Sequence, residues 1–411
     1  MDQGEIDNLP INGRNFLDFS RTVAGVTPQQ TSGEGSGLSF NGQRGRSNSL
    51  SIDGAENNGE LNGNTRLTMS QEAVREFQVV TNMFAPEFGN AGGGLVNVVS
   101  RSGANDFHGN IFYLMRNEAL DGRNAFSTDP KRPRFRRKNE GATLGGPILR
   151  NQTFFFAAVE YISRRESGQT TISDSSVAAI NGALAAHPIP NGGAKSISNG
   201  TFPVGYTTTL ASFKLDHTLN QNNSLTFRYI FPQDRQTNTN SVGGSTDVSG
   251  GGGQKTRDQS FVGAWTHIFS PTLLSETRFQ FAPRNLLQTA NDPVGPAVSI
   301  SGVASFGRNT SYPVLLDETH YEIDQSVSKQ SGRHSFKFGG TANFIRAHTS
   351  YPSTFGGQFS FASLADFVAG RAQSFSQGFG NPDIHFPENL LGFYAQDTFK
   401  LNSRPKFQAV K

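Results

Sequence analysis

Residues 224–231, SLTFRYIF, alternate between polar and apolar side chains. Successive side chains of a β-strand point to opposite sides of a sheet, so a period of two predicts a strand with one apolar face. The apolar side holds four residues and the opposite side includes a charge: Leu225, Phe227, Tyr229 and Phe231 against Ser224, Thr226 and Arg228. The segment therefore predicts a strand that separates an apolar environment from a polar one.

The same alternation recurs along the chain after Asn105. Four further segments place apolar residues on one side and charged or polar residues on the other: 211–216, 276–281, 321–327 and 335–344. Less regular strand-like segments lie at 107–116, 140–148, 153–162, 260–269 and 390–399. Together they predict about ten antiparallel strands, with few helix signals between them.

The connections between these strands alternate in length. Short turns are expected at 219–223, 270–273 and 329–333, and long polar segments at 166–205, 233–255, 287–319 and 347–388. Outer-membrane β-barrels show this rhythm, with tight periplasmic turns and long extracellular loops. The apolar face would then meet lipid and the charged face would line the lumen. Strands of a soluble sandwich also alternate, but long structureless loops are unusual inside compact domains.

Residues 1–104 have a different texture, with short strands separated by glycine-rich turns. Strands are expected at 51–54, 75–81 and 94–100. Short helices are expected at 13–23 and 70–75, where Ser70 can cap the second helix. This pattern predicts a small α+β unit ahead of the barrel strands.

The motif EFGNAGGGLVNVVSRSG, residues 87–103, raises the question of a phosphate-binding loop. Such a loop follows a strand and opens a helix, whereas these glycines precede a β-branched run, LVNVV. Neither nucleotide-binding glycine pattern is present. We therefore expect the glycines to allow tight turns and close backbone approach where the N-terminal part packs against the barrel wall, with residues 100–106 leading into the first barrel strand.

Composition excludes several classes of protein. The 411 residues include 46 Gly and 35 Phe but 0 Cys, which rules out a disulfide scaffold and thiolate zinc sites. A formal net charge of +3 provides no global basic field for nucleic acid, and no apolar run is long enough for a membrane-spanning helix. The acidic, polar start MDQGEIDNLP carries no secretory signal, so we expect an exported protein to have residues before it.

No catalytic, cofactor or metal site is predicted, and the chain is not expected to be an enzyme. G-x-S-x-G and H-E-x-x-H are absent. Glu322 and Asp324 could form an acid and base pair, but strand alternation favours neighbours on a wet wall. The histidines lack metal-ligand spacing and are expected in loops or at strand ends; they are residues 108, 187, 217, 267, 320, 334, 348 and 385.

The run KRPRFRRK, residues 131–138, is the densest group of charges, with six basic residues in eight. It could bind nucleic acid or another anion. Its position between the first two predicted strands favours an outer loop or rim instead. There it could meet lipopolysaccharide phosphates or an acidic ligand.

Several motifs, in this order, resemble one known family. They are LPINGRNFLDF at 9–19, NGQRGRSNSLSIDGAENN at 41–58, AVREFQVVTNMFAPEFGNAGGGLVNVVSRSGANDFHGNIF at 73–112, LGGPILRNQTFFF at 144–156 and, more loosely, GFYAQDTFK at 392–400. They resemble the plug domain and first strands of TonB-dependent outer-membrane receptors, with the Oar-like receptors as the closest branch. The resemblance implies an α+β plug at 1–104 and the N-terminal part of an antiparallel transmembrane β-barrel at 105–411. A complete barrel would have about twenty-two strands, so the chain is expected to be an internal fragment.

The resemblance also implies a function. A receptor of this family takes up a small-molecule or oligosaccharide ligand through a plugged barrel in the cell outer membrane of a Gram-negative bacterium. Its implied partners are the TonB–ExbB–ExbD complex, whose contact segment is not recognisable here, and outer-membrane lipid with lipopolysaccharide; nucleic acid is not expected. Arg44 and Arg46 could contact ligand, although the family favours ion pairs with the barrel wall. The ligand and its binding residues stay unknown.

Two alternatives stay open at this point. Some Oar-like proteins suggest surface adhesion or a secretion-related role for the same architecture. A soluble β-rich carbohydrate-binding protein would also contain alternating strands. For the barrel interpretation, an incomplete sheet would leave unpaired edges that hydrocarbon cannot satisfy, so this polypeptide alone is expected not to insert as a functional pore.

Overall fold

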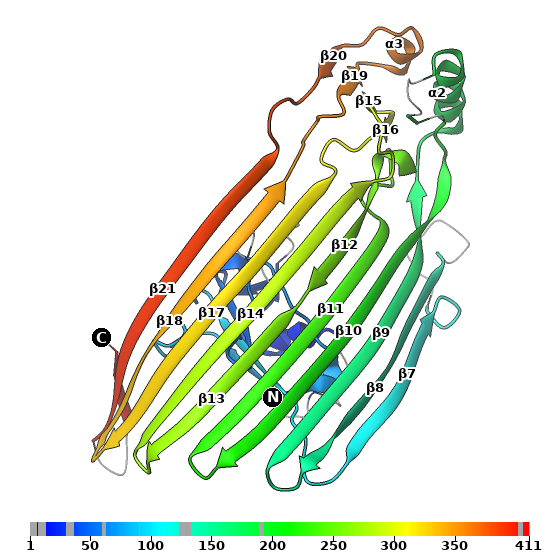
Figure 1. Cartoon of the computed structure of the whole chain (residues 1–411). Helices are drawn as coiled ribbons and strands as arrows, with labels where there is room; N and C mark the ends of the chain where they lie inside the picture. The colour runs from blue at the N-terminus through cyan, green and yellow to red at the C-terminus, as the bar shows by residue number, and fades with distance from the viewer. Residues whose placement is uncertain are drawn as a thin grey trace.

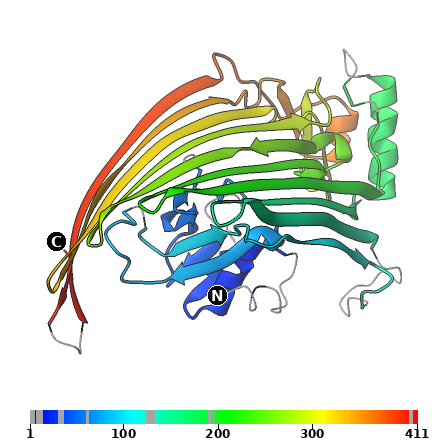
Figure 2. The ribbon, with the colours of Figure 1, turned by 60° about the horizontal axis from the view of Figure 1, so that its bottom comes forward.

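One large, curved antiparallel sheet dominates the computed structural model, and a smaller N-terminal part lies against its concave face (Figure 1, Figure 2). The structure describes residues 6, 14–29, 37–59, 63–89, 91–122, 133–188, 193–194, 196–401 and 406–410. Within these ranges, no helix combines the length and hydropathy needed to cross a membrane. The prediction of a large antiparallel sheet with few helices is confirmed.

The large sheet contains twelve strands in the described part of the chain. Their order is β22-β21-β18-β17-β14-β12-β11-β10-β9-β8-β7, and β13 pairs with β11 and β14 alongside β12. The strands are β7 His108–Asn117, β8 Phe135–Leu149, β9 Thr153–Thr170, β10 Gly200–Asn220, β11 Asn223–Asn240, β12 Gly252–Asp258, β13 Ser260–Ser270, β14 Leu273–Ala290, β17 Val314–Ser331, β18 His334–Ser350, β21 Asp383–Lys400 and β22 Lys406–Val410. β12 and β13 share one place in the sheet because only Gln259 separates them.

Short and long connections alternate, as predicted. Brief turns follow β8, β10, β13 and β17 and lie together at the bottom of Figure 1, which we call the turn end. The connections after β9, β14 and β18 are much longer and lie at the opposite end, which we call the loop end. The three short turns predicted from the sequence all fall at the turn end.

The loop end is more ordered than the sequence suggested. Strands β9, β10, β14 and β17 extend into segments predicted as loops, and the remaining residues form secondary structure of their own. These elements are α2 Asp174–Ala186, the 3-10 helix η5 Val248–Gly250, α3 Leu364–Val368 and a sheet of order β16-β15-β19-β20, with β15 Ala297–Ile300, β16 Ala304–Gly307, β19 Gln358–Phe361 and β20 Ser374–Ser376. The segments 166–205, 233–255, 287–319 and 347–388, predicted as long polar connections, therefore contain strand ends and ordered elements as well as loops. A separate apolar cluster that includes Ile180, Phe306 and Phe361 orders this end by burying surface.

The two faces of the large sheet differ as the alternation predicted. Phe227 on the outer face is 51% exposed, whereas Arg228 on the inner face is 3% exposed. Aromatic rings on the outer face contact one another across four strands; the ring centroids of Tyr229 and Phe261 lie 4.5 Å apart, those of Phe261 and Phe281 6.1 Å, and those of Phe281 and Tyr321 5.3 Å. The apolar residues thus form a continuous outward band, and the charged residues face the N-terminal part.

We call Ile6 together with the described residues of 14–104 the N-terminal unit. It contains a sheet of order β4-β3-β6-β5 and a separate pair β1-β2. Its elements are the 3-10 helices η1 Phe16–Thr22, η2 Gly45–Ser47 and η3 Gln71–Ala73, and the strands β1 Val26–Pro28, β2 Leu38–Phe40, β3 Ser49–Ile52, β4 Ala55–Glu56, β5 Val74–Val80 and β6 Leu95–Ser100. β5 and β6 confirm the strands predicted at 75–81 and 94–100, whereas the strand predicted at 51–54 lies at 49–52 and residues 53–54 form the turn after it. The predicted helices are shorter and of the 3-10 type, and Ser70 caps η3 by accepting from the backbone N of Glu72.

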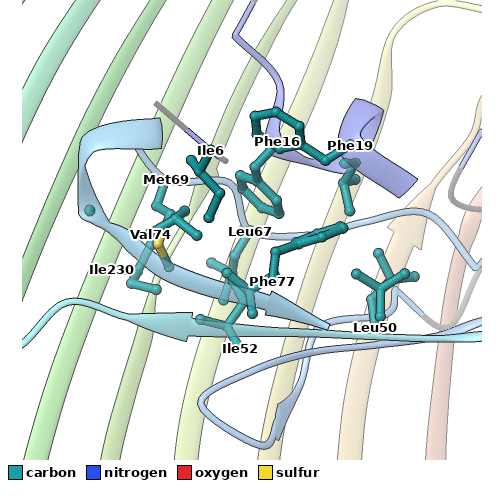
Figure 3. Packing of buried hydrophobic residues seen from close by; sticks show 14 of the residues in the cluster. Ile6, Phe16, Phe19, Leu50, Ile52, Leu67, Met69, Val74, Phe77 and Ile230 are labelled. Atoms are coloured by element: carbon teal, nitrogen blue, oxygen red, sulfur yellow. The ribbon is translucent and has the colours of Figure 1, made fainter. Parts of the chain in front are cut away.

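The core of the N-terminal unit is continuous with the large sheet (Figure 3). Phe16 and Phe19 pack their rings against Phe77, with centroids 6.3 Å apart in both pairs. Ile230 of β11 belongs to the same buried cluster, although it comes from the wall. Apolar contacts therefore hold the N-terminal unit against the inner face of the large sheet.

The glycines of residues 87–103 serve close packing, as predicted, but mostly within the N-terminal unit. A Cβ on Gly94 would lie 2.1 Å from the ring of Phe40, and one on Gly93 would lie 2.5 Å from Asn48. Only Gly103 of this motif meets the large sheet, where a Cβ would lie 2.3 Å from the carbonyl oxygen of Phe155. The motif thus closes the core of the unit first and touches the wall at its end.

Candidate functional site: the polar interface between the N-terminal unit and the sheet

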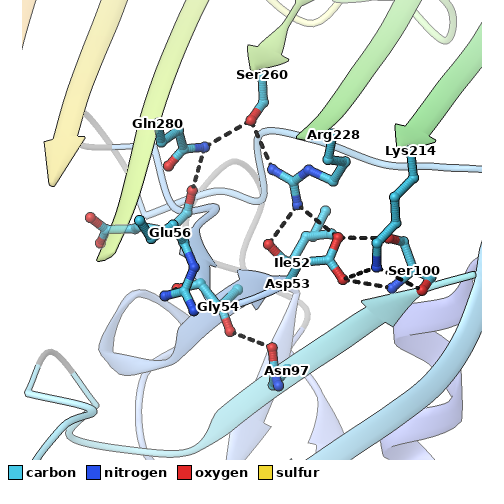
Figure 4. A network of polar contacts seen from close by, with 12 residues as sticks. Ile52, Asp53, Gly54, Glu56, Asn97, Ser100, Lys214, Arg228, Ser260 and Gln280 are labelled. Atoms are coloured by element: carbon cyan, nitrogen blue, oxygen red, sulfur yellow. Dashed lines mark hydrogen bonds and ion pairs between the residues drawn. The ribbon is translucent and has the colours of Figure 1, made fainter. Parts of the chain in front are cut away.

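The turn between β3 and β4 carries a carboxylate at the centre of this interface (Figure 4). Asp53 and Gly54 both adopt positive φ, 51° and 78°, which forms a tight hairpin. Ser100 donates to the Asp53 carboxylate from its backbone N at 2.8 Å and from its Oγ at 2.6 Å. On the wall side, Lys214 Nζ lies 3.6 Å and Arg228 Nη1 lies 3.5 Å from the same carboxylate. One acid of the unit therefore meets cations from two neighbouring strands.

Arg228 also holds the backbone of the hairpin. Its Nη1 donates to the carbonyl oxygen of Ile52 at 2.5 Å, and its Nη2 donates to Ser260 Oγ at 2.9 Å. Burial alone would raise the pKa of Asp53, but Arg228, Lys214 and hydrogen bonds outweigh it and lower that pKa below its ordinary value. Asp53 is therefore ionised at neutral pH and attracts both cations.

A second cluster surrounds Arg66, which reaches from the N-terminal unit into the wall. Its Nη2 donates to the carbonyl oxygen of Ala282 at 2.7 Å. Glu318 lies 3.5 Å from Arg66 Nε, and Asp258 lies 3.8 Å from Nη2. The three charged side chains are at most 3% exposed, and His320 Nε2 lies 2.7 Å from Glu318. Here the unit supplies the cation and the sheet supplies the carboxylates, the reverse of the arrangement at Asp53.

Further hydrogen bonds extend the interface across the sheet. The backbone N of Glu56 donates to Glu322 at 3.1 Å, and Asn343 Nδ2 donates to the Glu56 carboxylate at 2.7 Å. Ser70 Oγ donates to Glu160 at 2.5 Å. These contacts join the unit to β9, β17 and β18, so polar groups fix it along much of the curved wall.

A charged cavity of about 550 Å³ lies beside the Asp53 cluster, between the unit and the turn-end halves of the strands. Glu87 of the N-terminal unit and Lys337 of β18 both line it and form an ion pair with each other. Its charged lining residues are Asp53, Glu87, Glu276, Asp324, Lys214, Arg228, Arg278 and Lys337. The cavity therefore offers a polar space next to a contact that joins the unit to the wall.

A second cavity, of about 610 Å³, lies at the loop end and has the opposite chemistry. Its lining is mainly apolar and comes from α2, β15, β19, α3 and β20, including Leu184, Val298, Phe359, Phe367 and Phe375. The two ends of the molecule thus present different surfaces: an apolar hollow among the loops and a charged one at the turns.

The arginines singled out from the sequence do not form the predicted ion pairs. Arg44 and Arg46 are exposed, and neither pairs with a carboxylate within the described ranges. That prediction was wrong: Arg66, further along the chain, forms ion pairs with carboxylates of the wall instead. The sequence reasoning missed Arg66 and Asp53. It did place Arg228 on the polar face of its strand, and this alternation was the sequence signal that a wall residue faces the N-terminal unit.

Other predicted positions are distributed as follows. His320 lies within β17 and is 1% exposed, so its placement in a loop or strand end was wrong. Glu322 is 6% exposed and contacts the N-terminal unit, so it is not on a wet wall. Of the basic run, residues 133–138 are described, and β8 begins inside them at the loop end. No group of three or more His, Asp or Glu in the described residues could hold a metal ion.

The comparisons with known proteins agree with this architecture. Residues 99–187 and 170–405 match the model of the outer membrane beta barrel domain. The chain belongs to this outer-membrane β-barrel family. It is 35% identical over 127 residues to the TonB-dependent transporter Oar of Myxococcus xanthus, a match that covers 29% of this chain and 12% of that protein.

Solved transporters share the fold at low identity. The outer membrane transporter YddB from Escherichia coli has a TM-score of 0.69 and 12% identity, over 97% of this chain and 53% of its own. The ferric enterobactin receptor PfeA from Pseudomonas aeruginosa, in complex with enterobactin, has a TM-score of 0.61 and 13% identity, over 98% of this chain and 55% of its own. This chain thus spans about half the length of these two proteins.

These findings confirm the resemblance to TonB-dependent receptors and the outer-membrane location. The alternative of a soluble carbohydrate-binding protein is therefore wrong. The relatives are transporters and receptors, which fits a protein that is not an enzyme.

Proposed function

We propose that the chain forms the plug and adjoining barrel wall of an energy-coupled outer-membrane receptor. In this proposal residues 1–104 are the plug and residues 105–411 belong to the barrel. The observation that carries it is the position of the N-terminal unit on the inner face of the sheet, joined through buried charge pairs such as Arg66 with Glu318. The ligand would be a small molecule or an oligosaccharide that enters from the loop end.

The chemistry of the interface suits a plug that moves. Buried ion pairs and hydrogen bonds can be exchanged for contacts with water, so a polar interface separates at lower cost than an apolar one of equal area. The charged cavity beside Glu87 and Lys337 provides a place where a small displacement would open a hydrated route. Force from the TonB–ExbB–ExbD complex would supply that displacement. No covalent bond is made or broken.

Labelling of a buried cysteine tests this proposal without knowledge of the ligand. The 411 residues contain no cysteine, so Ser260→Cys in the complete gene product would add a thiol to this part of the wall, and the unsubstituted protein is the blank for any thiol elsewhere. Ser260 is 0% exposed and accepts from Arg228, so a maleimide reaches it only when the unit moves. Ser224→Cys, at an exposed position of the same sheet, is the control.

We expect Ser260→Cys to be labelled in energised cells and protected in cells that lack TonB, while Ser224→Cys is labelled equally in both. Equal labelling of Ser260→Cys with and without TonB would contradict the energy-coupled function.

A further inference from the structure

Three arginines lie in register on the inner face of the sheet. Backbone pairing sets Arg116 of β7 opposite Arg137 of β8, and Arg137 opposite Arg164 of β9. Residues an even number apart on a strand share a face, so Arg164 lies on the same face as Glu160, which contacts Ser70 of the N-terminal unit. Neighbouring strands are about 4.8 Å apart, so the three side chains form a row roughly 10 Å long.

Aromatic rings support the guanidinium groups of this region. Two arginines of the row lie over aromatic rings: Arg164 at 3.6 Å from the ring centroid of Tyr206 and Arg116 at 5.0 Å from that of Phe135. Arg14 of the N-terminal unit lies 5.3 Å from the ring centroid of Phe112. These are all the cation–π contacts found in the part of the chain that the structure describes. Stacking fixes the plane of a guanidinium and leaves its N–H groups at the edge available for oxygen acceptors.

The row places three positive charges side by side on neighbouring strands, which costs stability. Like charges directly opposite each other on neighbouring strands are destabilising. Each arginine already has a partner that offsets part of this cost: Asp121 lies 3.0 Å from Arg116, Glu166 lies 3.6 Å from Arg164, and Arg137 Nε donates to Asn139 Oδ1 at 2.9 Å. Both ion pairs are partly exposed, so water and added anions can compete for the guanidinium edges. A bound oxyanion would add a counter-charge that the whole row shares.

The basic run of the sequence divides between the two faces. Arg137 is on the inner face, whereas Arg136 is exposed on the outer face opposite Arg165 of β9. The outer pair has the same two strands, the same register and the same charge, but it faces away from the N-terminal unit. It is therefore a matched control for the inner row.

We propose that Arg116, Arg137 and Arg164 bind a ligand that carries two or more oxyanionic groups, such as phosphates or carboxylates. This inference rests on the proposed receptor function and names the chemical class of its ligand. The row lies on the loop side of Glu160, since Arg164 is nearer the loop end of β9. A ligand that enters from the loop end meets these arginines beside the N-terminal unit. Guanidinium forks bind such groups with paired, charge-assisted hydrogen bonds.

Calorimetric titration of the complete, detergent-solubilised receptor tests the proposal. The probe is inositol hexakisphosphate, and myo-inositol, which has the same ring without phosphates, is the uncharged control. We expect saturable binding of the hexakisphosphate alone. R137Q/R164Q should weaken it by about tenfold or more, since charge-assisted bidentate contacts are lost. R136Q/R165Q should leave it unchanged.

Three results would overturn the inference: no binding to the unmodified receptor, equal weakening by both double variants, or weakening by the outer pair alone, which would indicate a lipid-facing phosphate site. The thermal unfolding of R137Q/R164Q without ligand provides the folding control, and the hexakisphosphate should raise the Tm of the unmodified receptor more than that of the variant. TonB-dependent labelling of Ser260→Cys does not involve this row. It can succeed while phosphate binding fails, so the two proposals fail separately.

Discussion

Arg228 of the wall donates a hydrogen bond of 2.5 Å to the carbonyl oxygen of Ile52 in the N-terminal unit, although 176 residues separate them in the sequence. The same guanidinium lies beside the Asp53 carboxylate, which follows Ile52 in the hairpin. One wall side chain therefore recognises both the backbone and the charge of a single turn. The apolar core seats the unit, and this contact fixes its orientation.

Arg228→Met should loosen the N-terminal unit. The substitution removes one partner of a buried charge pair, which typically costs about 3–5 kcal/mol, and Lys214 offsets part of that loss at Asp53. We expect residues 14–104 to become sensitive to protease at a lower temperature than in the unmodified protein. Arg235→Met, at an exposed position of the same strand, is the control and should have little effect. Equal protease sensitivity of both variants would refute a specific role for Arg228.

Acid should release the unit through Asp53. Its pKa is lowered in the folded protein, so its ionised form contributes stability that is fully present above its ordinary value of 3.8. That stability is lost as the pH falls below 3.8 and through the lowered value. Asp53→Asn should start less stable at neutral pH and lose less of its stability over this acidic window. Parallel pH profiles of protease resistance for the two proteins would show that Asp53 is not the titrating group.

Gly94→Ala should destabilise the N-terminal unit by overpacking. The new Cβ would lie 2.1 Å from the ring of Phe40, and overpacking of this kind costs about 1–3 kcal/mol. Gly89→Ala is the matched control, since nothing lies within 4 Å of its Cβ position. The second substitution Phe40→Leu should recover part of the stability lost in Gly94→Ala. Thermal unfolding of the four proteins checks this, and an unchanged Tm in Gly94→Ala would contradict the close approach.

Much of the large sheet could be predicted because its signal is local. The alternation in residues 224–231 predicts which side chains share a face, and the lengths of the turns predict which strand ends lie together. The site could not be predicted in the same way. Whether Arg44 or Arg66 reaches the wall depends on how the unit sits against strands more than 190 residues away, and no local pattern encodes that register. The order at the loop end was missed for the same reason, since Ile180 and Phe361 become a core only after folding.

The last prediction concerns the outer face of the large sheet, where the cost of an arginine substitution should depend on its depth in the membrane. Phe227 is 51% exposed and lies four residues into β11, about 13 Å along the strand from the turn end. Leu219 is 56% exposed but lies at the turn itself. An arginine near the bilayer midplane of a β-barrel costs about 2–4 kcal/mol, and one near the interface costs about 0–1 kcal/mol. In the complete receptor, Phe227→Arg should therefore lower the folded, heat-modifiable fraction in outer-membrane extracts far more than Leu219→Arg. Equal effects of the two substitutions would mean that this aromatic band does not face hydrocarbon.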